Sequence, residues 1–169
     1  LAIGHNFNFE IAKIKALKDL WEIISKELNI ASNITILTKP TNRNKTLFDI
    51  NENDNYSTLS YKTSILSGAD FVEINLPNTH FKKETFKSLE EELTKIKILR
   101  KETQPNPIFE SFFIENLSYQ ISKNALEIIQ AVEKTGGILE NLKKGIIQKK
   151  VKECAETEIL SAPIPNEYS

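Results

Sequence analysis

Glu73 is the residue whose chemistry matters most in this sequence, because it lies in a short apolar stretch that predicts a buried β-strand at residues 71–76. Side chains along a strand point alternately to its two faces. The aliphatic face then holds Val72, Ile74 and Leu76, and the mixed face holds Phe71, Glu73 and Asn75. A carboxylate held at a site can accept and return a proton, so the partners of Glu73 decide whether the chain is an enzyme.

The two histidines and the single cysteine are further candidates for chemistry. His5 follows a predicted strand and could line the mouth of a barrel, although a loop histidine bonded to backbone is the favoured interpretation. The same interpretation is favoured for His80, which lies in a polar segment, while Cys154 reads as a small packing residue on a helix. The sequence contains no spacing typical of a metal site, a phosphate-binding loop or a nucleophile elbow, so motifs assign no catalytic or metal-binding residue.

Three basic side chains gather on a long polar segment, residues 39–53, that reads as a loop. In β/α barrels such loops build the face that carries the active site. Lys39, Arg43 and Lys45 would suit a contact with a phosphate-bearing ligand or with an acidic partner surface. A solvated loop without a ligand is the alternative.

Helices and strands alternate along the first two thirds of the chain. Apolar residues at steps of three and four predict amphipathic helices, and β-branched apolar runs predict strands. The predicted strands are residues 1–4, 33–38 and 71–76, and the predicted helices are residues 7–28, 54–67, 84–101, 116–134 and 138–158.

Two of these helices have clear apolar stripes. The stripe of the first helix includes Trp21 and Leu28, so we expect Trp21 to be mostly buried against the sheet. The stripe of the helix at residues 84–101 includes Leu93, which places Glu92 and Lys95 on the solvated side.

This order of elements predicts an α/β fold, the C-terminal part of a TIM-type (β/α)8 barrel with parallel strands, outer helices and a helical C-terminal end. The aliphatic faces of the strands then pack under the helices, and Glu73 faces the barrel axis. Residues 1–158 form this part, and residues 159–169 form an exposed tail. Three strand–helix units cannot close eight strands, so we expect the chain to be a portion of a longer protein.

Composition excludes several classes of function. The 169 residues carry a net charge of −1 at pH 7 and have a pI of about 6.2, which favours neither nucleic acid nor an anionic membrane as a partner. No apolar run approaches the roughly 20 residues of a membrane span. A single cysteine excludes an internal disulfide framework and is typical of the reducing cytoplasm, where we expect the protein to work.

Four blocks in order give the chain a family resemblance. It resembles the C-terminal half of the methylmalonyl-CoA mutase barrel, particularly the small (β) subunits of the bacterial heterodimeric enzymes. The blocks include a strand-to-helix sequence ending in Glu-Ile-Ala-Lys, an Arg-Asn-Lys-Thr loop, an Asn-Pro segment followed by Ser-Phe-Phe-Ile-Glu-Asn-Leu, and a Glu-Lys-Thr-Gly-Gly turn. They occupy residues 4–17, 43–49, 106–117 and 133–148.

Two departures from the family pattern concern the site. The resemblance implies a histidine near the cobalamin and substrate at the position of Glu73, and an arginine at the position of Tyr56. An imidazole can donate a hydrogen bond to a substrate carbonyl, whereas a carboxylate there would repel the developing charge. We therefore expect Glu73 to be a structural group paired with a basic residue.

The resemblance implies two alternative functions. In the first, the chain belongs to a non-catalytic, structural small subunit of a heterodimeric adenosylcobalamin-dependent methylmalonyl-CoA mutase. This subunit binds no cofactor itself, and a larger catalytic subunit carries the adenosylcobalamin. In the second, the chain is an active acyl-CoA mutase whose altered site centres on Glu73. The first alternative is preferred, with no catalytic and no cofactor-binding residue assigned to this chain.

Overall fold

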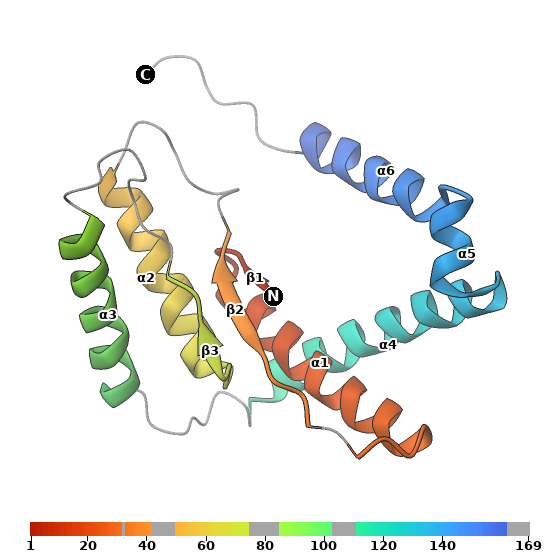
Figure 1. Ribbon diagram of the computed structural model, residues 1–169, viewed down its shortest axis with the longest axis horizontal. Coiled ribbons are helices and arrows are strands. Elements are labelled where there is room, and N and C mark those ends of the chain that lie inside the picture. The colour runs from red at the N-terminus through yellow and green to blue at the C-terminus, as the bar shows by residue number, and fades with distance from the viewer. Residues whose placement is uncertain (32, 42–49, 75–84, 103–110, 162–169) are drawn as a thin grey trace. The chain divides into compact units, whose positions relative to one another are not determined.

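The computed structural model describes residues 1–31, 33–41, 50–74, 85–102 and 111–161 (Figure 1). The chain divides into two compact units, Leu1–Lys123 and Asn124–Ser169, which are described separately below. Several residues named above lie outside the described residues: Arg43, Lys45, Asn75, Leu76, His80 and most of the tail at residues 159–169.

A three-stranded parallel sheet forms the centre of the first unit. The strands are β1 (Ala2–Ile3), β2 (Leu37–Pro40) and β3 (Phe71–Val72), in the order β1-β2-β3. Ala2 pairs with Lys39, and Leu37 pairs with Phe71, both in parallel register. The predicted parallel pairing is confirmed, and the α/β class with it; three strands are consistent with part of a barrel.

Strand β2 begins at Leu37, four residues after the predicted start at residue 33. Directly before it, the side chain of Asp70 occupies the position where a strand partner would bond the backbone. Its Oδ2 accepts a hydrogen bond of 2.7 Å from the amide of Ile36, and the carbonyl of Ile36 accepts from the amides of Asp70 and Phe71. The side-chain carboxylate thus satisfies the amide of Ile36, and strand pairing starts one residue later, at Leu37.

Helix α1 (Phe7–Glu27) connects β1 to β2 and covers one face of the sheet. The side chain of Asn6 caps its start by accepting from the amide of Phe9, at 3.2 Å. At its end Asn29 adopts a left-handed conformation, φ 51°, which asparagine tolerates better than most residues. Its buried residues form two clusters with the sheet and neighbouring helices: Ile14 with Ile3 and Ile36, and Ile11 and Ala12 with Leu66 and Ile114.

The predicted stripe of α1 was wrong at Leu28, which lies beyond the helix end and is 63% exposed. Trp21 is partly buried and is not among the exposed large side chains, which is consistent with its prediction as mostly buried. Helix α1 is longer than the short strands it covers, so its last turns extend beyond the core. The buried positions follow Ile14, Ala16 and Leu20 instead.

Helix α2 (Ile50–Leu66) follows β2 and buries a face of small hydroxyl residues. These hydroxyl groups donate to carbonyls one turn earlier; the buried ones are Ser57, Ser60, Thr63 and Ser64, at 2.8 to 3.0 Å. Because each hydroxyl is satisfied within the helix, its burial leaves no unpaired donor. Gly68, with φ 69°, follows the end of this helix and leads into β3.

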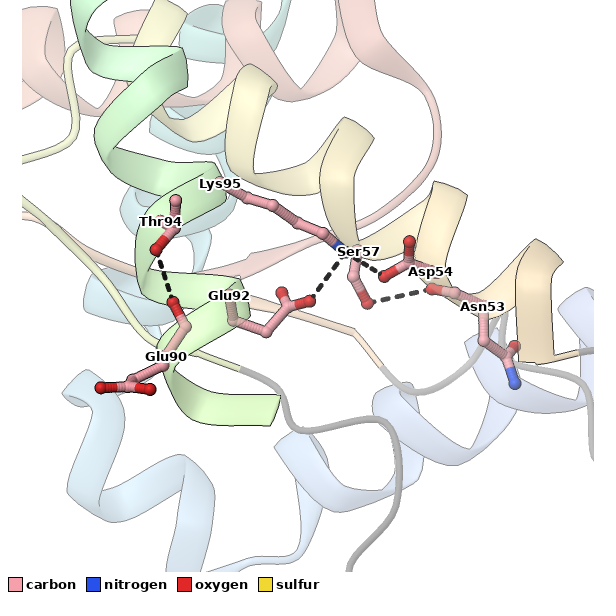
Figure 2. A network of polar contacts seen from close by, with 7 residues as sticks. All are labelled: Asn53, Asp54, Ser57, Glu90, Glu92, Thr94 and Lys95. Carbon is pink, nitrogen blue, oxygen red and sulfur yellow. Dashed lines mark hydrogen bonds and ion pairs between the residues drawn. The ribbon is translucent and has the colours of Figure 1, made fainter. Parts of the chain in front are cut away.

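Helix α3 (Thr85–Glu102) contacts α2 through charged side chains (Figure 2). Lys95 lies 2.5 Å from Asp54 of α2 and 3.0 Å from Glu92 of its own helix. The prediction was wrong for Glu92, which is 3% exposed, and for Leu93, which was placed on the apolar stripe but is exposed. Lys95 is partly exposed, and Ile96, one turn after Glu92, is buried, so Glu92 shares the buried side of α3 with an apolar residue.

Three helices end the described chain: α4 (Phe112–Lys134), α5 (Gly137–Lys143) and α6 (Ile146–Ser161). The first half of α4 packs in the first unit, where Ile114 is buried and Glu115 lies 3.1 Å from Lys15 of α1. One helix was predicted over residues 138–158, but Gly145, with φ 72°, divides it into α5 and α6. Among the described residues, none of the helices is apolar over a length that could cross a membrane.

Candidate functional site

The sheet has one covered face and one open face. Thr38 and Pro40 of β2 are buried, as is Ile36 directly before the strand, which packs with Ile14 of α1. On the other face Leu37 is 51% exposed and its register partner Phe71 is 59% exposed. The alternation predicted around Glu73 is therefore confirmed for the described residues: Phe71 and Glu73 are exposed, and Val72 and Ile74 are partly buried.

Glu73 forms an ion pair with Lys39 across β2 and β3. Lys39 Nζ donates to Glu73 Oε1 at 2.6 Å, and the amide of Glu73 donates to the carbonyl of Thr38 at 2.7 Å. The expected basic partner is thus present, although the side chains of Lys39 and Glu73 are 54% and 43% exposed. Lys39 is engaged with Glu73, and its predicted contact with a ligand or a partner, together with Arg43 and Lys45, stays a prediction.

A small hollow lies where β1 and β2 end and α2 passes beside them. The side chains and backbone that line it come from three places far apart in the sequence: Gly4, His5, Pro40, Thr41, Tyr56, Ser57 and Ser60. Carboxyl ends of parallel strands are the usual location of sites in β/α folds. The fold therefore brings His5 and Tyr56 to the same hollow.

The hydroxyl protons in this hollow are already used within the protein. Tyr56 donates to Glu52 Oε1 at 3.1 Å, Ser57 to the carbonyl of Asn53 at 3.0 Å, and Ser60 to the carbonyl of Tyr56 at 2.8 Å. The hydrogen bond to Glu52 raises the pKa of Tyr56, as do the negative charge of Glu52 and partial desolvation, so the phenol stays neutral. His5 and Thr41 also take part in interactions within the chain.

Sequence reasoning named His5 and Tyr56 but missed Ser57 and Ser60. The available signal was a repeat of hydroxyl residues along α2 at steps of three and four. Such a repeat can form a buried helix face, because each hydroxyl donates to a carbonyl of its own helix. Hydrophobicity alone gives no such indication, because serine is a polar residue.

The described residues contain no cluster of three or more His, Cys, Asp or Glu side chains that could hold a metal ion. Cys154 is exposed on α6 rather than packed, which corrects its interpretation as a packing residue. The site thus consists of the Lys39–Glu73 ion pair on the open face and of a hollow in which the hydroxyls of Tyr56, Ser57 and Ser60 donate hydrogen bonds within the protein.

Parallel strands joined through helices, with a site at the carboxyl ends of the strands, place this protein in the β/α class. Within that class the sequence model for methylmalonyl-CoA mutase matches residues 1–162, and the chain belongs to the methylmalonyl-CoA mutase family.

Individual relatives are distant and much longer. The chain is 25% identical over 162 residues to the mitochondrial methylmalonyl-CoA mutase of Bos taurus, covering 90% of this chain and 22% of that protein. It is 24% identical over 169 residues to methylmalonyl-CoA mutase of Rhizobium meliloti (strain 1021), covering 91% of this chain and 23% of that protein. The chain therefore spans about a fifth of the length of these relatives.

Proposed function

We propose that this chain is part of a non-catalytic small subunit of a heterodimeric, adenosylcobalamin-dependent methylmalonyl-CoA mutase. The complex would interconvert methylmalonyl-CoA and succinyl-CoA in the cytoplasm. A larger partner subunit would bind the adenosylcobalamin and perform the reaction, and the present chain would support that subunit.

The observation that carries this proposal is the ion pair between Glu73 and Lys39. At this position the resemblance to the family implies a histidine that contacts the substrate. Stabilising the charge that develops on a carbonyl oxygen requires a donor directed at that oxygen. Glu73 as a carboxylate is an acceptor, and its Oε1 is already bound to Lys39 at 2.6 Å.

The hollow at the strand ends supports the same conclusion. Where the family pattern implies an arginine, Tyr56 is a neutral phenol whose proton is donated to Glu52. The hydroxyls of Ser57 and Ser60 donate to carbonyls of their own helix. Among the described residues, these groups would have to break internal hydrogen bonds before they could polarise a thioester.

We propose that this open face does not hold the cofactor that the family implies, because its described residues offer that cofactor no imidazole. The face presents the Lys39–Glu73 pair between Leu37 and Phe71, and the described histidine, His5, lies in the hollow instead. We therefore derive no reaction step through adenosylcobalamin for this chain.

The alternative, an active acyl-CoA mutase in which Glu73 does acid–base work, is tested by the same experiment. The full-length subunit is purified without its partner, titrated with adenosylcobalamin by absorbance, and assayed with methylmalonyl-CoA. We expect neither cofactor uptake nor turnover, and Glu73→His should change neither, because residues that act as a unit do not regain activity singly. Stoichiometric cobalamin binding or turnover by the lone subunit would overturn the proposal.

A second experiment addresses the partner. Purification of the subunit from its native source should bring along a larger cobalamin-bearing chain in a one-to-one complex, identified by mass spectrometry and by the cobalamin spectrum. Purification of the subunit alone, or in a complex free of cobalamin, would count against the heterodimer.

A further inference from the structure

Lys39 and Glu73 are brought together by the sheet rather than by the flexibility of their side chains. Register pairs Leu37 with Phe71 and Thr38 with Val72; Lys39 is the next residue of β2, and Glu73 directly follows β3, with its amide donating to the carbonyl of Thr38. The backbone of Lys39 is fixed on its other side, where its amide donates to the carbonyl of Leu1 at 2.8 Å. Any side chain placed at position 73 therefore extends beside the same ammonium group.

The charge environment of position 73 is simple in the described part of the chain. Lys39 is the one charged group for which that part shows a contact with Glu73. The neighbouring positions on the open face, Leu37 and Phe71, are apolar. The electrostatic potential at position 73 is then set mainly by a single cation, whose influence decreases steeply with distance in water.

We propose that Lys39 is a positioning residue for position 73. Its ammonium group pairs with a carboxylate there and would repel a protonated imidazole introduced in its place. This inference rests on the proposed function in one respect: it makes Lys39 a second determinant of the inactivity of the site, beside Glu73. Replacing Glu73 by histidine would leave the new ring next to an unpaired ammonium group.

The test measures the pKa of the introduced imidazole in the full-length chain carrying Glu73→His. The pH is varied, the signals of labelled histidine are recorded by NMR, and the signal of the introduced ring is identified because the parent protein lacks it. Adding Lys39→Gln should raise the pKa of the introduced imidazole by about 0.5 to 1, because a like charge has been removed and solvent screens part of its effect. Adding Lys39→Arg, which keeps the charge, should leave that pKa unchanged. Lys26→Gln, on α1, is the control and should have no effect.

A second measurement does not depend on a histidine variant that folds. Acetylation of Lys39 by a limiting amount of acetic anhydride is followed by mass spectrometry in the parent and in Glu73→Gln. Loss of the partner should increase modification of Lys39 by about 1.5- to 5-fold, the range expected for an exposed ion pair. The matched control is Glu22→Gln, which frees Lys26 from a pair of equal length, 2.6 Å, and should change Lys26 but not Lys39.

The outcomes separate this inference from the proposed function. An imidazole pKa that does not respond to Lys39→Gln, or an unchanged modification of Lys39 in Glu73→Gln, would overturn the role of Lys39. Turnover by the lone Glu73→His subunit would instead overturn the proposed function, even if Lys39 controls the imidazole as expected.

Discussion

At the scale of single residues, two lysine pairs differ in what surrounds them. The pair of Lys39 with Glu73 lies on an open face, and both of its side chains are exposed to solvent. Its contribution to the free energy of unfolding is therefore small. The pair of Lys95 with Glu92 and Asp54 includes a carboxylate that is 3% exposed. Removing the cation in the second case leaves a buried charge without a partner.

Lys95→Met tests this difference. Because Lys95 and Asp54 are themselves partly exposed, we expect a loss of about 1–3 kcal/mol in the free energy of unfolding, below the cost for a fully buried pair. Lys26→Met, which removes the partner of exposed Glu22, should leave the free energy of unfolding nearly unchanged. Urea denaturation measures both, and equal losses would show that Glu92 does not need its counter-ion.

The same cluster predicts a dependence on alkaline pH. Burial alone would lower the pKa of Lys95, but hydrogen bonds and charges from Asp54 and Glu92 outweigh it and raise that pKa. A raised folded-state pKa stabilises the fold fully below the ordinary lysine pKa of about 10.4, and this contribution is lost as the pH rises through the folded value. From a pH of about 10 upward, the parent should lose more stability than Lys95→Met; parallel losses in the two proteins would contradict this.

At the scale of elements, sequence patterns predicted the order and the pairing better than the details of burial. Alternating runs located all three strands and the helices that follow them, because period and turn residues such as Gly68 are local properties. On α3, Lys95 pairs with Asp54 of α2, a partner that only the fold brings near. On α2, the buried hydroxyl groups donate to their own helix, a local pattern that hydrophobicity does not detect. The hollow next to His5 was beyond sequence reasoning, since it joins three distant segments.

The end of α2 gives a prediction at this scale. Gly68 has φ 69°, and a Cβ there would lie 3.0 Å from Lys18 Nζ, which donates to the carbonyl of Gly68 at 2.7 Å. Gly68→Ala should therefore cost about 1–2 kcal/mol for the left-handed conformation and up to about 1 kcal/mol more for the disturbed hydrogen bond.

Gly145→Ala is the matched control, because Gly145 has a similar φ of 72° and no atom within 4 Å of the added methyl group. It should show the conformational cost alone. Thermal unfolding of the two variants compares them, and a cost for Gly68→Ala that does not exceed that of Gly145→Ala would remove Lys18 from the explanation.

At the scale of the whole molecule, the two units leave apolar surface exposed in different ways. In the first unit, the open sheet face presents Leu37 and Phe71. In the second unit, Asn141 is the one buried residue among residues 124–157, and it is buried through hydrogen bonds to the carbonyls of Val132 and Gly137. Large side chains such as Leu139, 72% exposed, have no core of their own there.

Such surfaces associate in water, and strands β1 and β3 add an unpaired edge each among the described residues. We therefore expect a protein consisting of residues 1–169 alone to form oligomers or aggregates, as measured by size-exclusion chromatography with light scattering. Leu37→Lys, which places a charge on the open face, should shift this distribution toward smaller species, whereas Lys62→Glu, at an exposed position of α2, should not. A stable, monodisperse monomer of the parent sequence would contradict the expectation, because it would show that these faces need neither further strands nor a partner chain to cover them.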